Sequence, residues 1–474
     1  MNILMLAAEV APYAKVGGLA DVAGALPKAL RQLGHDVRVV MPCYGSIDRA
    51  KWNLREEAPP FTTVVGHETL HVTTPESSMD GVPIAFLDVM GFFGSRPRIY
   101  GEPDDGRRFL FFCAAALELT SRAGWKPDVV HANDWHTAIA PVLLATGRAG
   151  PFLRDTAGLF TIHNLAYQGM LERGTLGGAE ALLPDGVADS HVNIMELGLR
   201  SADVITTVSP TYAHEIQTGD YGAGLDWLLR ARHDRLHGVL NGIDTDVFNP
   251  ATDPHIAAQY DLKDWSGKAV CKAALQQEAG LAVDPRAPVI GMVGRLVDQK
   301  GFDLFAAAVE PLLAHTPAQV VILGTGEPHY HALLDHLQHR FPGRLRAWLT
   351  FDAALAQRIY AGADMFLMPS RFEPCGLGQM IAMRYGTVPI VRGTGGLVDT
   401  VQEGPPGAPR TGFVFWEYDA GALQHALGRA LSVFEYPDQW HQLIENDMSA
   451  DFSWTRSAAI YAGLYQDAVD LKRG

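Results

Sequence analysis

Short apolar runs alternate with helical patterns along nearly the whole chain, and this alternation restricts the possible folds more than any other feature of the sequence. Such runs predict strands that are buried on both faces of a sheet. In the first half they lie at 2–10, 36–42, 82–90, 127–134, 158–164 and 203–209, with helical spacing at 19–34 and 108–122. In the second half the strands lie at 288–296, 318–324, 345–351, 363–370, 387–393 and 411–416, and the helices at 301–315, 353–362, 377–386 and 422–434. This order predicts parallel βαβ units.

A turn-rich stretch without periodicity, 238–254, interrupts the alternation and marks a domain junction. We therefore predict an α/β protein with two Rossmann-like, doubly wound domains that face a deep interdomain cleft, with the boundary after residue 240. In such sheets ligands bind beyond the carboxyl ends of the strands. Polar residues that directly follow a strand are therefore the candidate site residues. At the end of the chain, a helical pattern places Ile460, Leu464 and Val469 on one apolar face.

Charge and cysteine content exclude several classes of partner. The formal net charge is −15 and no basic block occurs, which argues against a nucleic-acid surface or a membrane-binding patch. The four cysteines are widely scattered, with no CxxC pair that would indicate a disulfide framework or a zinc site. We find neither a signal-peptide pattern nor an apolar run of about 18 residues, so we expect a cytoplasmic protein.

Polar motifs follow three strands of the first half. KVGGLADV, residues 15–22, has two glycines that let a ligand approach the backbone, and Lys15 at a helix start favours an anion. An ordinary glycine turn is the alternative. HANDWH, residues 131–136, and TIHNLAYQG, residues 161–169, offer Asp134 and His163 to a hydroxyl-rich ligand. Their histidines could instead be structural, or could bind a metal, although no known metal-ligand spacing is present.

In the second half, GRLVDQKG, residues 294–301, places Arg295 and Lys300 on one loop after a strand. Paired cations suit a diphosphate because they neutralise charge on a leaving phosphate. Solvated surface charges are the alternative. RGTGGLVDT, residues 392–400, offers backbone N–H groups at a second helix start. SRFEPCGLGQM, residues 370–380, adds a carboxylate, Glu373, directly after a third strand.

Taken in order, these motifs resemble the glycogen and starch synthase family. The resemblance rests on KVGGLADV, HANDWH, IHNLAYQG, NGID, GRLVDQKG, SRFEPCGLGQM, MRYGTVP and TGGLVDTV, and it extends over essentially the whole chain. It implies a retaining glucosyltransferase that needs no metal or other cofactor and transfers glucose from ADP-glucose to the non-reducing end of an α-1,4-glucan. It also implies that 1–240 is the acceptor-side domain, that 241–455 binds the nucleotide-sugar, and that a helix at 456–474 crosses back to the first domain.

The resemblance also implies roles for individual residues. Arg295 and Lys300 would bind the diphosphate, and His163 and Asn241 the glucosyl unit. Asp134 would lie near the reaction centre. The remaining residues would contact the donor: Lys15, Gly17, Gly18, Asp21, Glu373, Cys375, Gly376, Thr394, Gly395 and Gly396. Phe351 stands where many members have tyrosine, and it keeps an aromatic face for the base while it lacks the hydroxyl.

Glu373 raises a mechanistic question, because double displacement needs a carboxylate nucleophile and a separate acid/base. No second acid stands near it in SRFEPCGLGQMIAMRYG, and Asp134 is the obvious substitute. We therefore predict that Glu373 orients the sugar and stabilises positive charge. Two alternatives to the implied activity are a related transferase with another sugar nucleotide or a small acceptor, and a non-catalytic glucan-binding protein. The intact set of polar residues argues against the second. The sequence does not indicate an oligomeric state.

Overall fold

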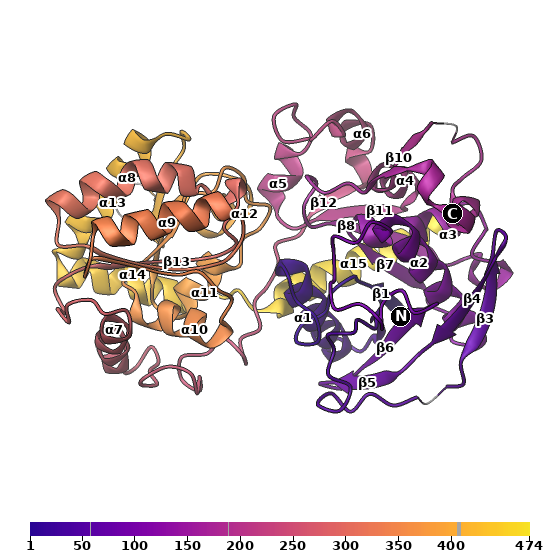
Figure 1. Ribbon diagram of the computed structural model, residues 1–474, viewed down its shortest axis with the longest axis horizontal. Helices are drawn as coiled ribbons and strands as arrows, with labels where there is room; N and C mark the ends of the chain where they lie inside the picture. Colours follow the sequence, from indigo (N-terminus) through magenta and orange to yellow (C-terminus); the bar gives the residue numbers. More distant parts are fainter. Residues whose placement is uncertain (57, 188, 405–408) are drawn as a thin grey trace. The chain divides into compact units, whose positions relative to one another are not determined.

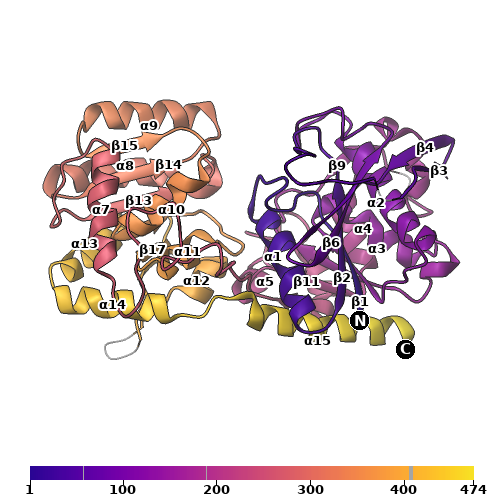
Figure 2. The same ribbon diagram turned by 90° about the horizontal axis from the view of Figure 1, so that it is seen from below.

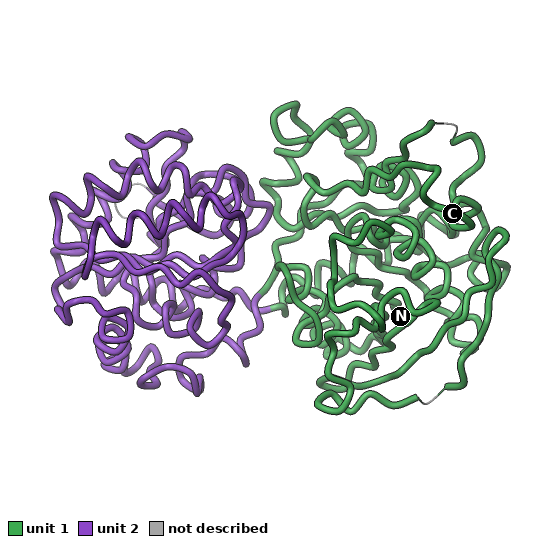
Figure 3. Tube along the Cα trace, viewed as in Figure 1, with its two compact units in different colours: residues 1–242, 454–474 green, residues 243–453 purple. Residues whose placement is uncertain are grey.

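The computed structural model describes residues 1–474 apart from 57, 188 and 405–408, and this part of the chain forms two compact units. Unit 1 comprises Met1–Gly242 together with Trp454–Gly474, and unit 2 comprises Ile243–Ser453 (Figure 3). Each division lies two residues from the boundary drawn from the sequence, because Gly242 packs directly on Trp454 within unit 1.

Unit 1 is built on a mixed sheet with strand order β12-β11-β8-β7-β1-β2-β6-β4-β3, and β5 pairs with β6 (Figure 1). The parallel strands are β1 (Asn2–Leu6), β2 (Asp36–Pro42), β6 (Val82–Val89), β7 (Val129–Asn133), β8 (Ala157–Ile162), β11 (Val204–Thr207) and β12 (Leu236–Gly238). Antiparallel pairs extend one edge through β3 (Phe61–Val65), β4 (Glu68–Thr73) and β5 (Glu76–Met79). A separate hairpin joins β9 (Met170–Glu172) to β10 (His191–Asn193).

The helices of unit 1 are α1 (Gly18–Gln32), α2 (Asp105–Arg122), α3 (Ile139–Ala145), α4 (Ile194–Ser201), α5 (Pro210–Glu215), α6 (Asp226–Ala231) and α15 (Trp454–Arg473). The last of these packs against α1 and against β7, β8 and β11 (Figure 2). Leu464 and Val469 are buried there, as the apolar pattern predicts. The same prediction is wrong for Ile460, which is 44% exposed, because the buried face is formed largely by Ala458, Tyr461, Tyr465 and Ala468.

Unit 2 has a fully parallel sheet with strand order β15-β14-β13-β16-β17-β18. Its strands are β13 (Val289–Val293), β14 (Gln319–Leu323), β15 (Leu345–Trp348), β16 (Met365–Met368), β17 (Val388–Arg392) and β18 (Phe413–Phe415). Its helices are α7 (Ser266–Glu278), α8 (Phe302–His315), α9 (Pro328–Arg340), α10 (Ala353–Gly362), α11 (Gly378–Arg384), α12 (Gly395–Thr400), α13 (Ala420–Phe434) and α14 (Pro437–Ser449). Helices α8 and α9 cover one face of the sheet, and α7, α10 and α11 the other (Figure 1).

The predicted fold class of two Rossmann-like α/β domains is confirmed by these sheets. In unit 2 every strand runs in the same direction, so the loops that leave the carboxyl ends meet at one edge. In unit 1 the same holds for β1, β7 and β8, whose following loops carry the polar motifs. Within the described residues, no helix is both long and apolar enough to cross a membrane.

Candidate active site

Three loops of unit 2 converge at the carboxyl edge of its sheet. The loop after β13 ends in the short 3-10 helix η6 (Asp298–Lys300), and Gly301 follows it with φ of +73°. A Cβ at Gly301 would lie 2.0 Å from the carbonyl oxygen of Pro369, so only glycine permits this approach to the loop after β16. Gly395, the first residue of α12 after β17, has φ of +46°, and a Cβ there would lie 2.0 Å from the carbonyl oxygen of Glu373. The sequence motifs that carry these glycines are therefore packed together.

Glu373 lies at the centre of this convergence and is 5% exposed. Its Oε2 accepts hydrogen bonds from Lys300 Nζ at 2.6 Å and from Ser370 Oγ at 2.9 Å. Among the described residues no partner is recorded for Oε1, which leaves that atom able to accept a hydroxyl of a ligand. The ammonium of Lys300 has three N–H groups and uses one on Glu373. Two side chains that sequence reasoning assigned to different roles thus form one ion pair.

Arg295 is half-buried on the same loop as Lys300, and the described part of the chain offers it no acidic partner. It is therefore a cation that a ligand phosphate can pair with. The loop after β14 is fastened beside it, since Leu296 N donates to Thr325 O at 2.9 Å and Glu327 N donates to Leu296 O at 2.8 Å. Phe351 follows β15 at the same edge of the sheet and is 70% exposed, which makes it available to stack on a flat group.

The remaining predicted residues of unit 2 lie in the segments that follow β16 and β17. Cys375 is buried at 4% exposure, and its carbonyl oxygen accepts Gln379 Nε2 at 3.1 Å. The amide of Gly396 donates to the carbonyl oxygen of Glu373 at 3.2 Å, and that of Thr394 to Arg392 O at 3.0 Å. The bond of Gly396 joins the segment after β17 to the loop after β16, whereas the bond of Thr394 lies within its own loop. Gly376 has φ of +71° and lies against Gln379.

In unit 1 the loop of Lys15 is held by a buried carboxylate that sequence reasoning missed. Glu9 Oε2 accepts the amides of Val16 at 2.5 Å and Gly17 at 3.1 Å, and Tyr100 donates its hydroxyl to Glu9 Oε1 at 3.1 Å. Burial raises the pKa of Glu9, although the hydrogen bonds from the backbone amides of Val16 and Gly17 lower it. Glu9 thus fixes the loop from within the protein.

The ends of this loop carry the other predicted residues. Lys15 Nζ lies 2.6 Å from Asp21 Oδ1 in a partly exposed ion pair at the start of α1. Gly17 is the N-cap of α1, and Gly18 is its exposed first residue. The structure therefore brings Lys15, Gly17, Gly18 and Asp21 together around one helix start, where partial positive charge favours an anion.

Asp134 and His163 also lie together, after β7 and β8. Asp134 Oδ1 accepts the amides of His163 at 2.7 Å and Asn164 at 3.4 Å. Asp134 itself has φ of 55° and ψ of 178°, a conformation that costs a non-glycine residue on the order of 1–3 kcal/mol. Burial raises the pKa of its carboxyl group to about 7. The side chain of Asp134 therefore positions the loop of His163, and the backbone of Asp134 itself is strained.

The hydrogen bonds around His163 fix its tautomer. Asn133 Nδ2 donates to Leu6 O at 3.0 Å, so Asn133 Oδ1 is the atom that faces His163 Nε2 at 2.8 Å. Because Oδ1 is an acceptor, Nε2 carries the proton and Nδ1 is left as an acceptor. Burial lowers the pKa of His163 to about 3, so the ring is neutral.

His131 and His136, the other two histidines of these motifs, are structural. His131 binds Tyr465 Oη through Nδ1 at 2.8 Å and Thr161 Oγ1 through Nε2 at 2.6 Å, which leaves no nitrogen for a metal. His136 is buried against Tyr100 and Phe109, and burial lowers its pKa to about 3. The metal site considered from the sequence is therefore not supported by this geometry.

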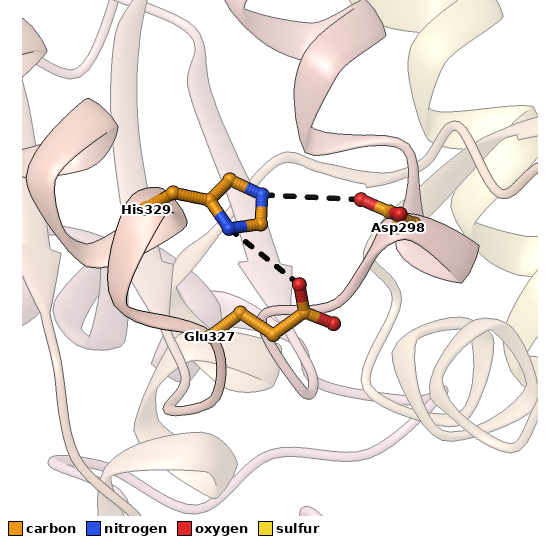
Figure 4. A group of neighbouring side chains, drawn as sticks. All are labelled: Asp298, Glu327 and His329. Atoms are coloured by element: carbon orange, nitrogen blue, oxygen red, sulfur yellow. Dashed lines mark ion pairs between the residues drawn. The ribbon is translucent and has the colours of Figure 1, made fainter.

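A different trio in unit 2 has metal-ligating groups close together among the residues described. Asp298 Oδ1 lies 3.9 Å from His329 Nε2, and Glu327 Oε2 lies 3.5 Å from His329 Nδ1 (Figure 4). All three side chains are exposed. Exposed charged side chains of this kind commonly pair with one another in solvent. His329 makes one such contact with Asp298 and one with Glu327.

Asn241 follows β12 in unit 1 and is 5% exposed. Its Oδ1 has no hydrogen-bond partner within the described residues, which is unusual for a buried amide. The predicted residues thus form three sets: Lys15, Gly17, Gly18 and Asp21 at the start of α1, Asp134 and His163 after β7 and β8, and the residues around Glu373 in unit 2. Sequence reasoning missed Glu9, Tyr100 and Ser370. The signal for Glu9 was a charged residue near the end of the apolar run 2–10.

Comparisons with known proteins show the family of the chain. The family model for the starch synthase catalytic domain matches residues 2–231, and that for glycosyl transferases group 1 matches residues 287–432. A glycogen synthase of Desulforudis audaxviator is 45% identical over 99% of this chain and 97% of its own, and one of Anaeromyxobacter dehalogenans strain 2CP-C is 47% identical over 98% and 99%.

Solved structures show the same likeness. The catalytic domain of starch synthase IV from Arabidopsis thaliana, bound to ADP and acarbose, is 38% identical with a TM-score of 0.93, and the match covers 99% of both chains. Sucrose-phosphate synthase from Thermosynechococcus elongatus shares the fold at 18% identity, with a TM-score of 0.62 over 98% of both chains. The chain therefore belongs to the glycogen and starch synthase family of glycosyltransferases.

Proposed function

We propose that this protein transfers glucose from ADP-glucose to the non-reducing end of an α-1,4-glucan, with retention at the anomeric carbon. The observation that carries the proposal is the ion pair of Lys300 with Glu373 at the meeting point of three loops, in a chain whose relatives are glycogen synthases. The Arabidopsis relative was solved with ADP and acarbose, which supports an adenine nucleotide and a carbohydrate as ligands here.

The proposal assigns the donor diphosphate to Arg295 and Lys300. Charge-assisted hydrogen bonds from these cations stabilise negative charge as it develops on the leaving phosphate. Arg295 has no competing acid in the described chain, and Lys300 keeps two N–H groups after its bond to Glu373. The exposed ring of Phe351 would stack on the adenine. It lacks a hydroxyl, so the base is selected chiefly by shape.

Glu373 would orient the glucosyl ring through its free Oε1 and stabilise positive charge at the anomeric carbon. In the reaction the bond between this carbon and the diphosphate oxygen breaks, and O4 of the acceptor bonds on the same face. The proton of that hydroxyl passes to the departing phosphate oxygen. A covalent alternative needs a second carboxyl group as acid/base. Asp134 is the obvious substitute, but its Oδ1 already accepts hydrogen bonds from two backbone amides.

The proposal also gives roles to residues of unit 1. Lys15, Gly17 and Gly18, with Asp21 beside them, would approach the nucleotide-sugar. His163 offers Nδ1 as an acceptor for a sugar hydroxyl because Nε2–H is held by Asn133. The unpartnered Oδ1 of Asn241 is a second acceptor for such a hydroxyl. The proposal gives Cys375 and Gly376 contact with the sugar, and Thr394 to Gly396 proximity to it.

The test is to incubate the protein with glycogen and either ADP-glucose or UDP-glucose, and to measure both released nucleotide and chain elongation. We expect faster turnover with ADP-glucose, and added glucose that β-amylase removes, which requires α-1,4 linkage at non-reducing ends. Nucleotide release without elongation would favour a small acceptor or another donor. Glycogen binding without any turnover would favour the non-catalytic alternative.

A further inference from the structure

A buried glutamine, Gln379, contacts the segment that carries Glu373, and the reaction proposed above gives it no role. It lies on α11 and is 0% exposed. Burying a polar amide costs free energy unless hydrogen bonds compensate for it, so the hydrogen-bond partners of Gln379 indicate what it does. We call residues 373–376 the Glu373 segment.

The amide nitrogen of Gln379 binds the backbone of the Glu373 segment. Nε2 donates to the carbonyl oxygen of Cys375 at 3.1 Å and to that of Gly376 at 2.9 Å. Carbonyl oxygens only accept hydrogen bonds, so these two contacts fix the orientation of the side-chain amide. A Cβ at Gly376, whose φ is +71°, would lie 2.5 Å from Gln379 Oε1. The side chain is therefore packed tightly against the end of the segment.

The same nitrogen also reaches α12, through Thr400. Gln379 Nε2 donates to Thr400 Oγ1 at 3.1 Å, and that hydroxyl donates to the carbonyl oxygen of Gly396 at 2.7 Å. The amide of Gly396 in turn donates to the carbonyl oxygen of Glu373 at 3.2 Å. A chain of hydrogen bonds thus runs from Gln379 through Thr400 and Gly396 to Glu373. It ties both ends of the Glu373 segment to one neighbouring helix.

Burial makes this chain of hydrogen bonds sensitive to substitution. Thr400 and Glu373 are each 5% exposed, and a Cβ at Gly396 would lie 2.2 Å from the carbonyl oxygen of Cys375. Removal of the Gln379 amide therefore takes the shared donor from two backbone carbonyl groups in a closely packed place, which is costly. The segment would shift to find new partners. A shift of about 1 Å in a group that orients a substrate can lower a rate about 100-fold.

We infer that Gln379 and Thr400 are positioning residues for glucosyl transfer, which hold the Glu373 segment against α12 in the geometry that the transferred sugar requires. The inference rests on the proposed function for the contact of Glu373, Cys375 and Gly376 with that sugar. It assigns neither Gln379 nor Thr400 a contact with the substrate. It differs from a general contribution to folding, because it predicts a loss of rate in protein that is fully folded.

The test uses the full-length protein with Gln379→Met, which keeps the length of the side chain and removes its donor. The matched control is Gln276→Met, because Gln276 is 1% exposed in the same unit. Gln276 Nε2 donates to Asp284 O and to Gln319 Oε1, both at 2.9 Å, at the edge of the sheet where β14 begins. Turnover is measured with ADP-glucose and glycogen, ADP binding by calorimetry, and stability by urea unfolding.

We expect Gln379→Met to lower kcat about 10- to 100-fold. The dissociation constant of ADP should change less than about 3-fold, because the proposal assigns the base and the diphosphate to Phe351, Arg295 and Lys300. Gln276→Met should lower the urea midpoint as well, yet keep kcat within about 2-fold of the wild type. The inference is overturned if Gln379→Met keeps a normal kcat, if it loses ADP affinity in proportion to kcat, or if the control loses as much rate.

Thr400 provides a second measurement, which decides the question even if Gln379→Met does not fold. Thr400→Ser keeps the hydroxyl and should keep kcat within about 2-fold, whereas Thr400→Val removes it and should lower kcat about 5- to 20-fold. The double variant should be at most about 2-fold slower than Gln379→Met alone, since either change breaks the same chain of hydrogen bonds. Equal rates for Thr400→Ser and Thr400→Val, or multiplied losses in the double variant, would also overturn the inference.

Failure of the proposed function would appear differently in these experiments. Turnover of the wild type with UDP-glucose alone would contradict the proposed donor, while the variants could still be compared with the wild type on UDP-glucose. A wild type that transfers glucose from neither donor would contradict the proposed function and the inference together.

Discussion

The ion pair between Lys300 and Glu373 determines what a single substitution does at the candidate site. We expect Lys300→Ala to lower kcat/KM at least about 100-fold, because it removes a charge that stabilises the leaving phosphate. The same change leaves Glu373, which is 5% exposed, without its cation. We therefore also expect a loss of about 1–3 kcal/mol in the free energy of unfolding.

Steady-state kinetics and urea unfolding check both parts of this prediction. Lys263→Ala serves as the control, because Lys263 is an exposed lysine in the same unit. A near-normal rate for Lys300→Ala would mean that the side chain acts as an ordinary surface charge. A normal stability would mean that the carboxylate of Glu373 finds another partner.

Glu373 and Cys375 stand two positions apart and should respond differently to substitution. Glu373→Ala should lose most of its kcat, since the sugar loses an acceptor and a stabilising charge. Cys375→Ser should keep substantial activity, because the thiol is a small packing group at 4% exposure. Mass spectrometry of the intact protein with a slow donor should detect no glucosyl adduct. A covalent glucose on Glu373 or Asp134 would refute the proposed mechanism and leave the family membership intact.

The raised pKa of Asp134 predicts a pH-dependent stability. In the folded protein the group has a pKa of about 7, against about 3.9 when unfolded. Between these values the folded state holds more protons, so the free energy of unfolding falls as the pH rises through this window. From pH 5 to pH 8 the loss attributable to this group is no more than about 3 kcal/mol.

Asp134→Asn isolates that effect, because the amide oxygen can still accept the His163 amide. Its urea-unfolding stability should fall less than that of the wild type between pH 5 and pH 8. Activity should drop less than about 10-fold if the residue positions the His163 loop without reacting. Identical pH profiles for the two proteins would show that the carboxyl group titrates normally, and a much larger activity loss would point to a role for its charge.

Among the elements, α15 shows where an apolar pattern misleads. The sequence places Ile460, Leu464 and Val469 on one face, yet Ile460 is 44% exposed and Leu464 is 7% exposed. Leu464→Ala should therefore lower the free energy of unfolding by about 2–4 kcal/mol, while Ile460→Ala should cost less than about 1 kcal/mol. Urea unfolding followed by circular dichroism measures both. Equal effects would contradict the orientation of the helix.

The parallel strands other than β12 were predictable because their apolar patterns are local. An apolar run such as 36–42 coincides with β2, and the helix pattern at 353–362 coincides with α10. The antiparallel strands β3, β4 and β5 were missed because their outward faces are polar and dilute the apolar signal. Helix α9 was missed because PHYHALLDHLQHR buries only Tyr330, Leu334 and Leu337.

The candidate site was predictable in its residue types but not in its pairings. The motifs placed Lys300 and Glu373 after separate strands, and nothing local says that these strands are neighbours. Their contact follows from the sheet order β13-β16. Glu9 was missed because the local sequence around it does not indicate the two backbone amides that donate hydrogen bonds to its carboxylate. Contacts between distant segments depend on tertiary packing, which a local pattern does not encode.

On the scale of the whole molecule, a protein of net charge −15 must bind an anionic donor through local positive charge. The proposal assigns that charge to Arg295, Lys300 and Lys15 rather than to a metal ion. We therefore expect EDTA to leave kcat within about 2-fold of its untreated value, as measured by nucleotide release. His329→Ala, which removes the centre of the exposed trio in Figure 4, should likewise change little. Loss of turnover in EDTA that magnesium or manganese restores would contradict the assignment.

Because α15 packs in unit 1 while unit 2 precedes it in the chain, the order of synthesis matters. A ribosome adds about 5–20 residues per second, so unit 1 remains without this helix for on the order of tens of seconds while unit 2 is made. During that interval the ring of His131 lacks the Tyr465 hydroxyl, and the surface that α15 covers on β7, β8 and β11 is open to chaperones or to misassembly. The unit that begins to emerge first is therefore the last to be completed.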